Sequence, residues 1–197
     1  MALLHRLRSD ESLMRCYQQG DASAFTQLYN RHKDRLYNFL LRACGNAALA
    51  EELAQDAWTS LIDRVAHYRP EAKFSTYLFT IARNKLTDYL RRPTNTHTDS
   101  LDSLAEEKGM EAVMPGQEQD MLQQVQCKRL LVSIVALPVE QREAFILKEE
   151  GFSLQEIASI TEVTAETVKS RIRYARQRLR STLNEQDAAT TNVRVSE

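Results

Sequence analysis

The apolar side chains of this chain recur every three or four residues along most of its length. Between residues 10 and 92 the pattern forms four runs, which are separated by Gly20, by Gly45 and by residues 69–73. Spacing of this kind places the apolar side chains on one face of an α-helix. Four helices of this length can enclose a core, so the pattern predicts a small helical bundle in residues 1–93.

The helical pattern is lost after Arg92 and returns near residue 126. Two prolines and two glycines interrupt a polar stretch there, and such residues disfavour helices. We therefore expect a flexible linker at residues 94–125, with at most a short helical turn inside it. A second helical domain follows at residues 126–183, and the polar residues 184–197 predict a disordered tail.

The second domain carries the signals of two short helices joined by a tight turn. Ser153 precedes Glu156 by three residues, which is the spacing of a capping box. After a short break, Thr164 is a favourable N-cap for the second helix. The pattern predicts a helix-turn-helix, with an ordinary helical hairpin as the alternative. The turn contains no glycine, so we expect Glu162 to adopt a left-handed conformation at a cost of about 1 kcal/mol.

The second of these helices combines a narrow apolar stripe with a strongly basic remainder. Val168, Ile172, Ala175 and Leu179 fall on one face at the helical period. Between residues 169 and 180 there are six basic side chains and no acidic one. A surface of this kind suits the phosphates and base edges of duplex DNA. A merely solvated helix face is the alternative.

Positive and negative charges are divided unevenly between the segments. The whole chain holds 26 basic and 27 acidic side chains. Residues 1–93 hold 14 basic and 10 acidic side chains, and residues 126–183 hold 10 basic and 7 acidic ones. Residues 94–125 between them hold 1 basic and 7 acidic side chains. The nearly neutral total therefore conceals two basic domains joined by an acidic linker.

Composition favours an all-α protein of the cytoplasm. Only 5 Gly and 4 Pro occur among 197 residues, and no stretch approaches the roughly 18 apolar residues of a membrane span. The first ten residues lack the apolar core of a signal peptide. The three cysteines are too far apart for a disulfide framework or a metal site. We expect no membrane insertion, no metal and no cofactor.

A polar face accompanies the third apolar run of the first domain. Residue types leave two interpretations open, which are a docking face for a partner and a solvated face beside a core tryptophan. The polar members of this face, with the only tryptophan of the chain, are Glu51, Glu52, Gln55, Asp56, Trp58 and Ser60.

The last helix of the first domain, with the segment before it, mixes aromatic rings and cations. Aromatic rings beside cations suit unpaired bases and their phosphates, and amides or hydroxyls can read a flipped base. Some of these side chains are also expected in the core, and periodicity does not say which. The candidates are Tyr68, Arg69, Lys73, Phe74, Tyr77, Arg83, Asn84, Lys85, Arg91 and Arg92.

Three stretches resemble, in the expected order, the regions of bacterial extracytoplasmic-function (ECF) sigma factors. The stretch ELAQDAWTSLIDRV (52–65) resembles region 2.2. The stretch FSTYLFTIARNKLTDYLRR (74–92) resembles regions 2.3 and 2.4. Region 4 is resembled by ALPVEQREAFILKEEGFSLQEIASITEVTAETVKSRIRYARQRL (136–179). A lone helix-turn-helix is a weak signal, but this ordered set covers most of residues 11–183.

The resemblance implies a sigma factor that binds core RNA polymerase and directs promoter-specific initiation. Region 2.2 would dock on the clamp helices of the β′ subunit, and the β flap is a further expected contact. Regions 2.3 and 2.4 would open the minus-10 element and hold a flipped base. An anti-sigma factor is the implied regulator, and no obligate homo-oligomer is expected.

The resemblance also assigns residues to these roles. The polar face of the third run becomes the polymerase face. The minus-10 set gains Ser75, Thr76 and Asp88. Region 4 would read the minus-35 duplex, and its candidates are Thr164, Glu166, Thr167, Lys169, Ser170, Arg171, Arg173, Tyr174 and Arg176.

Three positions depart from the family pattern. The acidic stretch of region 2.2 reads LAEE at residues 49–52 and lacks its first acid. Tyr77 stands where the family often has Trp, which retains a stacking surface. Glu162 replaces the turn glycine of region 4.

Two other classes of protein compete with this interpretation. A conventional helix-turn-helix regulator would need a dimer to read two half-sites, and it would leave the aromatic and basic segment at 68–92 without a role. An enzyme would need a catalytic constellation. The four histidines form no metal spacing, and the chain has no Gly-rich phosphate loop and no visible pairing of a nucleophile with a base.

Overall fold

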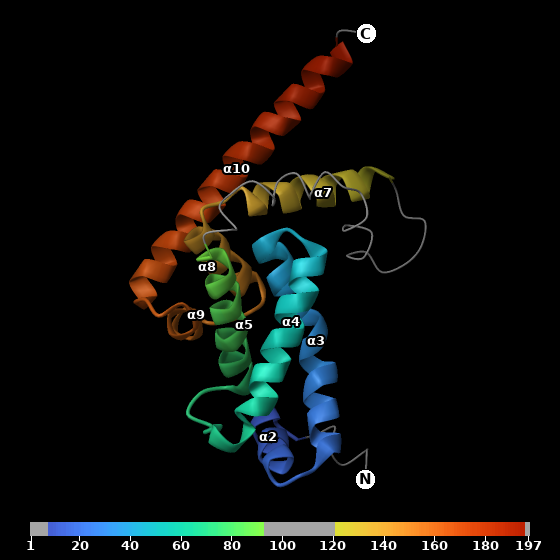
Figure 1. Ribbon diagram of the computed structural model, residues 1–197. Coiled ribbons are helices and arrows are strands. Elements are labelled where there is room, and N and C mark those ends of the chain that lie inside the picture. Colours follow the sequence, from blue (N-terminus) through green and yellow to red (C-terminus); the bar gives the residue numbers. More distant parts are fainter. Residues whose placement is uncertain (1–7, 93–120, 196–197) are drawn as a thin grey trace.

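A computed structural model describes residues 8–92 and 121–195 of the chain, and all regular structure in these two ranges is helical (Figure 1). The all-α prediction is thereby confirmed. The helices of the first half are α2 (Asp10–Gln18), α3 (Ala22–Cys44), α4 (Ala47–Asp63), the short 3-10 helix η1 (Val65–His67) and α5 (Phe74–Leu90). The second half contains α7 (Met121–Val135), α8 (Val139–Glu149), α9 (Leu154–Thr161) and α10 (Ala165–Val195).

The first half is a bundle whose helices begin and end at recognisable capping residues. Asp21 and Asn46 accept hydrogen bonds from the first turns of α3 and α4, which satisfies N–H groups that a helix start leaves unpaired. Gly45 ends α3 in the left-handed conformation, with φ 73°, which glycine adopts without steric cost. The bundle is filled by fully buried side chains such as Leu28 and Phe39.

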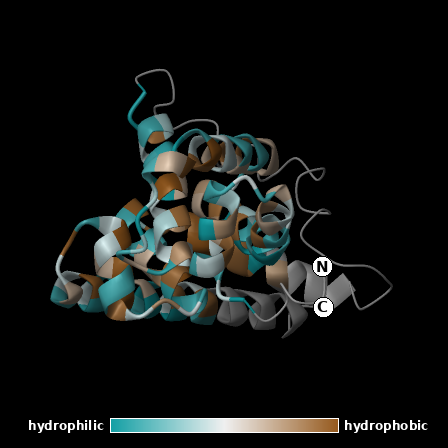
Figure 2. Ribbon diagram, turned by 90° about the horizontal axis from the view of Figure 1, so that it is seen from below, coloured by the Kyte–Doolittle hydropathy of each residue, from teal (hydrophilic) through white to brown (hydrophobic). Residues whose placement is uncertain are grey.

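The two halves pack against each other around one continuous hydrophobic core. Buried apolar side chains of both halves belong to this core, and Figure 2 shows hydrophobic positions on the ribbon gathered toward the centre of the molecule. Helix α5 lies against α9, and α3 lies against α7 and α8. The rings of Phe79 and Phe152 meet across this boundary with centroids 4.8 Å apart. Sequence periodicity gave no indication of this contact, because both residues simply read as core positions of their own halves.

Charged side chains surround the apolar part of this boundary. Glu150 approaches Arg35 and Arg42 of α3, each at 3.4 Å between guanidinium nitrogen and carboxylate oxygen. The Arg142 guanidinium donates to the backbone oxygen of Ala43, at the end of α3. The boundary between the halves therefore combines an aromatic contact with ion pairs.

Two predicted boundaries differ from the structure. Residues 94–120 of the expected linker lie outside the described residues, but α7 begins at Met121, before the expected start at 126. Helix α10 continues to Val195, through the residues for which we predicted a disordered tail. No Pro or Gly lies between residues 184 and 197, so no helix breaker ends α10.

Candidate nucleic-acid interface

Helices α9 and α10 form the predicted helix-turn-helix. Ser153 accepts from the Glu156 backbone N–H, and the Glu156 carboxylate accepts from the Ser153 N–H, which completes the capping box. In the turn Glu162 has φ 58° and ψ 40°, which confirms the expected left-handed conformation. Thr164 accepts from the backbone N–H of Thr167 and thereby caps α10.

The left-handed turn permits a stability prediction. Changing Glu162 to glycine is expected to raise the free energy of unfolding by up to about 1 kcal/mol, because the side chain causes the steric cost. The matched control is Ser159→Gly at an exposed helical position of α9, which should lower it by about 0.5–1 kcal/mol. Urea denaturation measures both. A lower stability of Glu162→Gly would show that the turn carries no relievable strain.

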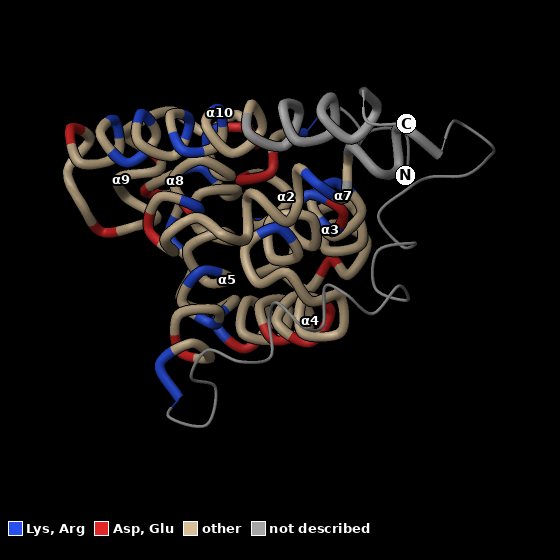
Figure 3. The backbone as a smooth tube through the Cα atoms, turned by 90° about the horizontal axis from the view of Figure 1, so that it is seen from above, with Lys and Arg blue, Asp and Glu red and all other residues tan. Residues whose placement is uncertain are grey.

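Helix α10 buries its apolar stripe and exposes its polar remainder. Val168, Ile172, Ala175 and Leu179 are all buried, with at most 7% of their surface exposed. Figure 3 shows Lys and Arg positions repeated along α10. The exposed members of the predicted minus-35 set are Thr164, Glu166, Thr167, Lys169, Arg173, Tyr174 and Arg176, and the half-buried ones are Ser170 and Arg171.

The cations of α10 are only weakly engaged within the protein. The Arg176 guanidinium lies 3.5 Å from a Glu149 carboxylate oxygen, and both side chains are about half exposed. The Arg173 guanidinium lies over the Tyr174 ring, 4.9 Å from its centroid. Contacts of this kind at an exposed surface contribute little to stability. The Arg173 and Arg176 side chains can therefore leave them and contact a nucleic acid instead.

The aromatic and basic segment at 68–92 divides into a core part and a surface part. Tyr68, Phe74 and Thr76 are buried and belong to the bundle core. Ser75, Tyr77, Arg83 and Lys85 are half-buried. The members that present an exposed side chain are Arg69, Lys73, Asn84, Asp88, Arg91 and Arg92.

Two cations of this segment are paired with acids of the second half. Lys73 lies 2.9 Å from Glu156, measured from Nζ to the carboxylate oxygen. The Arg83 guanidinium lies 3.5 Å from the carboxylate of Glu143, a buried side chain of α8. Burial raises the pKa of Glu143, and the positive charges of Arg83 and Arg171 oppose this effect. In the packed arrangement the second half therefore covers part of the segment.

The pKa of Glu156 predicts an acid-sensitive contribution to stability. It falls from the ordinary 4.5 to about 2, first because the Ser153 N–H donates to the carboxylate and then because of Lys73, against the opposing effect of burial. A lowered pKa contributes stability above pH 4.5, which is lost as the pH falls from 4.5 toward 2.

The expected result is that Glu156→Gln loses less stability than the unmodified chain in this pH window. The amide oxygen can still accept from the Ser153 N–H, so the capping box stays intact. Urea denaturation at a series of pH values measures the difference. Parallel stability curves for the two chains would mean that Glu156 does not carry the effect.

The polar face of α4 borders a groove between α3 and α4. Of the predicted polymerase face, Glu51, Glu52, Gln55 and Asp56 are exposed, and Ser60 is half-buried. Trp58 is buried, with 6% of its surface exposed.

Aromatic side chains of α3 form the opposite side of this groove. The Trp58 ring contacts Phe25 and Tyr29, with centroids 5.9 and 5.1 Å apart. Tyr29 and Ile62 are each 40% exposed at the groove. Tyr29 and Ile62 were not predicted as surface residues. Tyr29 occupies an apolar position of its helical run, and an apolar side chain such as Ile62 gives no sequence signal of exposure.

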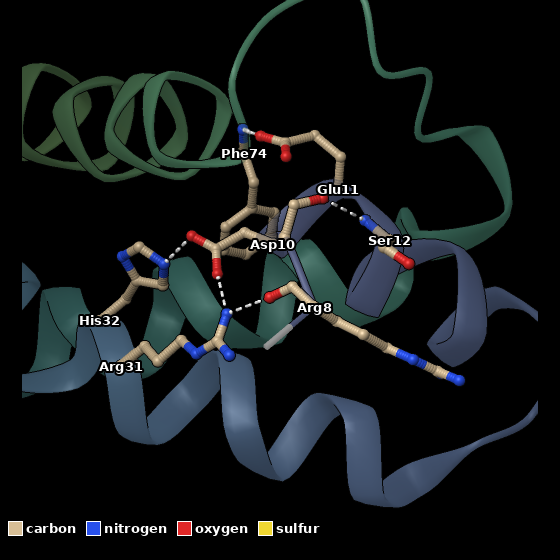
Figure 4. A network of polar contacts seen from close by, with 8 residues as sticks. Arg8, Asp10, Glu11, Ser12, Arg31, His32 and Phe74 are labelled. Atoms are coloured by element: carbon tan, nitrogen blue, oxygen red, sulfur yellow. Dashed lines mark hydrogen bonds and ion pairs between the residues drawn. The ribbon is translucent and has the colours of Figure 1, made fainter. Parts of the chain in front are cut away.

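A polar network at the start of α2 was also missed (Figure 4). Asp10 contacts Arg31 and His32, each at 2.7 Å between oxygen and nitrogen. Glu11 accepts from the backbone N–H of Phe74, the first residue of α5. These contacts join residues that are 21 to 63 positions apart in the sequence, and no local pattern encodes them.

Within residues 8–92 and 121–195, no group of His, Cys, Asp or Glu side chains comes together as a metal site requires. Of the helices in these ranges, none combines the length and apolarity that a membrane span needs.

Comparison with known proteins matches both halves to family models. The model of Sigma-70 region 2 matches residues 28–96, and that of Sigma-70, region 4 matches residues 127–179. RNA polymerase sigma factor CarQ of Myxococcus xanthus is 31% identical over 87% of this chain and 96% of its own length. ECF RNA polymerase sigma factor SigM of Mycobacterium tuberculosis is 32% identical over 87% of this chain and 83% of its own length.

Two solved structures share the fold. The sigma factor RpoE of Bartonella quintana, solved in complex with the anti-sigma factor NepR, gives a TM-score of 0.63 at 23% identity and covers 81% of this chain and 96% of its own. CnrH, solved with the cytosolic domain of CnrY, gives a TM-score of 0.66 at 22% identity. The match covers 90% of this chain and 99% of CnrH. At these identities the likeness concerns the arrangement of the helices.

Proposed function

This chain belongs to the ECF RNA polymerase sigma factors, and from this premise we propose how its surfaces divide the work of promoter-specific initiation. The observation that carries the proposal is the division of α10 into a buried apolar face and an exposed basic face. A buried apolar stripe packs this helix against α8 and α9, while most of its cations stay exposed. This is the arrangement in which a recognition helix enters the major groove.

The first proposed surface reads the minus-35 element. The exposed face of α10 from Thr164 to Arg176 offers guanidinium, ammonium and hydroxyl donors. Arginine can bond two acceptors of guanine at once in the major groove, and lysine neutralises phosphates. We assign base contacts to Arg171, Arg173 and Arg176, and phosphate or base contacts to the remaining candidates of the minus-35 set.

The second proposed surface opens the minus-10 element. The exposed and half-buried candidates of residues 69–92 supply cations, an amide and the Tyr77 ring for an unpaired strand. Burial removes Tyr68, Phe74 and Thr76 from direct contact in the described arrangement. Their proposed role is to hold the loop at residues 69–73 from beneath.

The third proposed surface binds core polymerase. The acidic and amide side chains of α4 lie next to the groove that Phe25, Tyr29 and Trp58 line. Such a groove, with an aromatic floor and a charged rim, has the anatomy of a protein interface. We propose that the β′ clamp helices occupy it, with Trp58 supporting the face from within the core.

Regulation and location follow from the same premise. The anti-sigma factor that accompanies RpoE of Bartonella quintana in its solved structure supports an anti-sigma factor as a partner of this chain. We place the chain in the cytoplasm, where its polymerase works, without a cofactor or an obligate homo-oligomer. A protein of this kind need not catalyse a bond-forming or bond-breaking step, so we propose that it is not an enzyme.

The test of this function is transcription in vitro with purified core polymerase on a library of random promoters, with and without the chain. Initiation that depends on the chain, at sites with two spaced elements, is the expected result. The free chain should bind the same DNA weakly, because each basic surface alone neutralises few phosphates at physiological salt. If the free chain binds DNA specifically and core polymerase ignores it, the chain acts as an ordinary helix-turn-helix regulator instead.

A further inference from the structure

Side chains of α2 form hydrogen bonds with the backbone at both ends of the segment that separates α4 from α5, and we call these hydrogen bonds the ties to α2. The side-chain amide nitrogen of Gln18 donates to the backbone oxygen of Val65 at 2.8 Å and to that of Tyr68 at 3.1 Å. Glu11 accepts from the backbone N–H of Phe74 at 3.0 Å. The exposed loop at residues 69–73 lies between these ties.

Apart from the ion pair between the exposed Lys73 side chain and Glu156 of the second half, little else fixes this loop. Residues 68–73 have no helical ladder, and the structure gives one backbone hydrogen bond within them, from the Glu71 N–H to the Arg69 oxygen. The Tyr68 ring is buried and anchors the start of the loop from below. The end of the loop passes into α5 at Phe74, whose ring is also buried. The backbone path between the two rings is therefore held mainly by the ties to α2.

The position of α2 does not depend on Gln18. Leu13 and Met14 are fully buried and hold α2 in the bundle core. Gln18 itself lies on the surface. Removal of its amide would expose two carbonyl groups to water, which can replace the lost donor. Its loss should therefore affect the shape of the loop far more than the stability of the fold.

We propose that Gln18, supported by Glu11, is a positioning residue that holds the loop at residues 69–73 in the shape that captures an unpaired base of the minus-10 strand. This inference rests on the proposed minus-10 function of residues 69–92. A loop that is already ordered loses less conformational freedom when DNA binds. The two ties therefore increase both the affinity for the unpaired strand and the discrimination between bases.

The test uses holoenzyme that contains the full chain with Gln18→Met, which keeps the length of the side chain and removes its donors. The matched control is Gln19→Met at the neighbouring exposed position. The probe is a forked DNA whose non-template minus-10 strand is single-stranded, with each base varied in turn. A second probe is a minus-35 duplex without the fork.

The expected result for Gln18→Met is about tenfold weaker binding of the fork, since each hydrogen bond contributes modestly, together with reduced preference among bases at one minus-10 position. Binding of core polymerase and of the minus-35 duplex should match the control, which a general structural defect would not allow.

The outcomes that overturn the inference are distinct from failure of the proposed function. If Gln18→Met holoenzyme binds the fork and selects bases as the unmodified holoenzyme does, the positioning role is wrong. If it loses core polymerase as well, Gln18 is a structural residue only. If the unmodified holoenzyme itself does not bind the single-stranded minus-10 strand, the proposed minus-10 function fails and the inference fails with it.

Discussion

Replacing Arg171 and Arg176 together by alanine is expected to reduce promoter-dependent initiation by about a hundredfold. Each guanidinium that bonds a base contributes about 1–3 kcal/mol, and a tenfold change corresponds to about 1.4 kcal/mol. Arg176 is exposed and has only a weak partner in Glu149. Arg171 is half-buried on the same helix, and its positive charge acts on the buried Glu143 carboxylate. Arg176 can therefore turn toward DNA at little internal cost, whereas Arg171 gives up part of this interaction.

The measurement is transcription in vitro with the minus-35 sequence randomised. The double variant should lose selectivity at specific minus-35 positions and keep its affinity for core polymerase. Arg180→Ala is the matched control, because Arg180 is exposed on the same helix but lies beyond the minus-35 set. Unchanged minus-35 selectivity in the double variant would remove these two side chains from the readout.

Reversing the charge of Glu150 is expected to separate the two halves of the free chain. The Glu150 side chain is 10% exposed and approaches two guanidinium groups of α3. Breaking a well-buried pair by removal of one partner costs about 3–5 kcal/mol, and the value here is smaller because Arg35 and Arg42 are each about 40% exposed. Glu150→Lys adds a third cation to that pair, so repulsion replaces attraction.

Small-angle X-ray scattering of the free chain measures this separation as a larger radius of gyration. Asp63→Lys, an exposed position at the end of α4 in the first half, replaces an acid by a cation away from the boundary and should leave the curve unchanged. Separation also uncovers Arg83 and Lys73, so the free Glu150→Lys chain should bind single-stranded DNA more tightly. Superimposable scattering curves for Glu150→Lys and the unmodified chain would show that the ion pairs do not hold the halves together.

Features encoded within a few residues were predicted from the sequence. The capping box of Ser153 and Glu156, the left-handed Glu162 and the buried stripe of α10 all depend on spacings of three to eleven positions. Such signals survive in any tertiary context, because each is satisfied within one helix or one turn. The helix-turn-helix was therefore visible before any packing was known.

Features that join distant segments were not predicted. Arg35 and Glu150 are 115 positions apart, and Gln18 and Tyr68 are 50 positions apart. The spacing of a helical run also does not determine which of two apolar faces is buried most deeply. Phe74 was for this reason a candidate for DNA contact, but its side chain is buried in the core. Packing decides these matters, and packing depends on pairs that sequence spacing does not relate.

The position of Trp58 has an optical consequence. As the only tryptophan, buried between Phe25 and Tyr29, it makes the tryptophan fluorescence of the chain a property of the first half alone. Far-ultraviolet circular dichroism follows the helices of both halves. Coincident unfolding transitions by the two methods would therefore indicate that the contact between the halves makes them unfold cooperatively, whereas separated transitions would indicate two independent units.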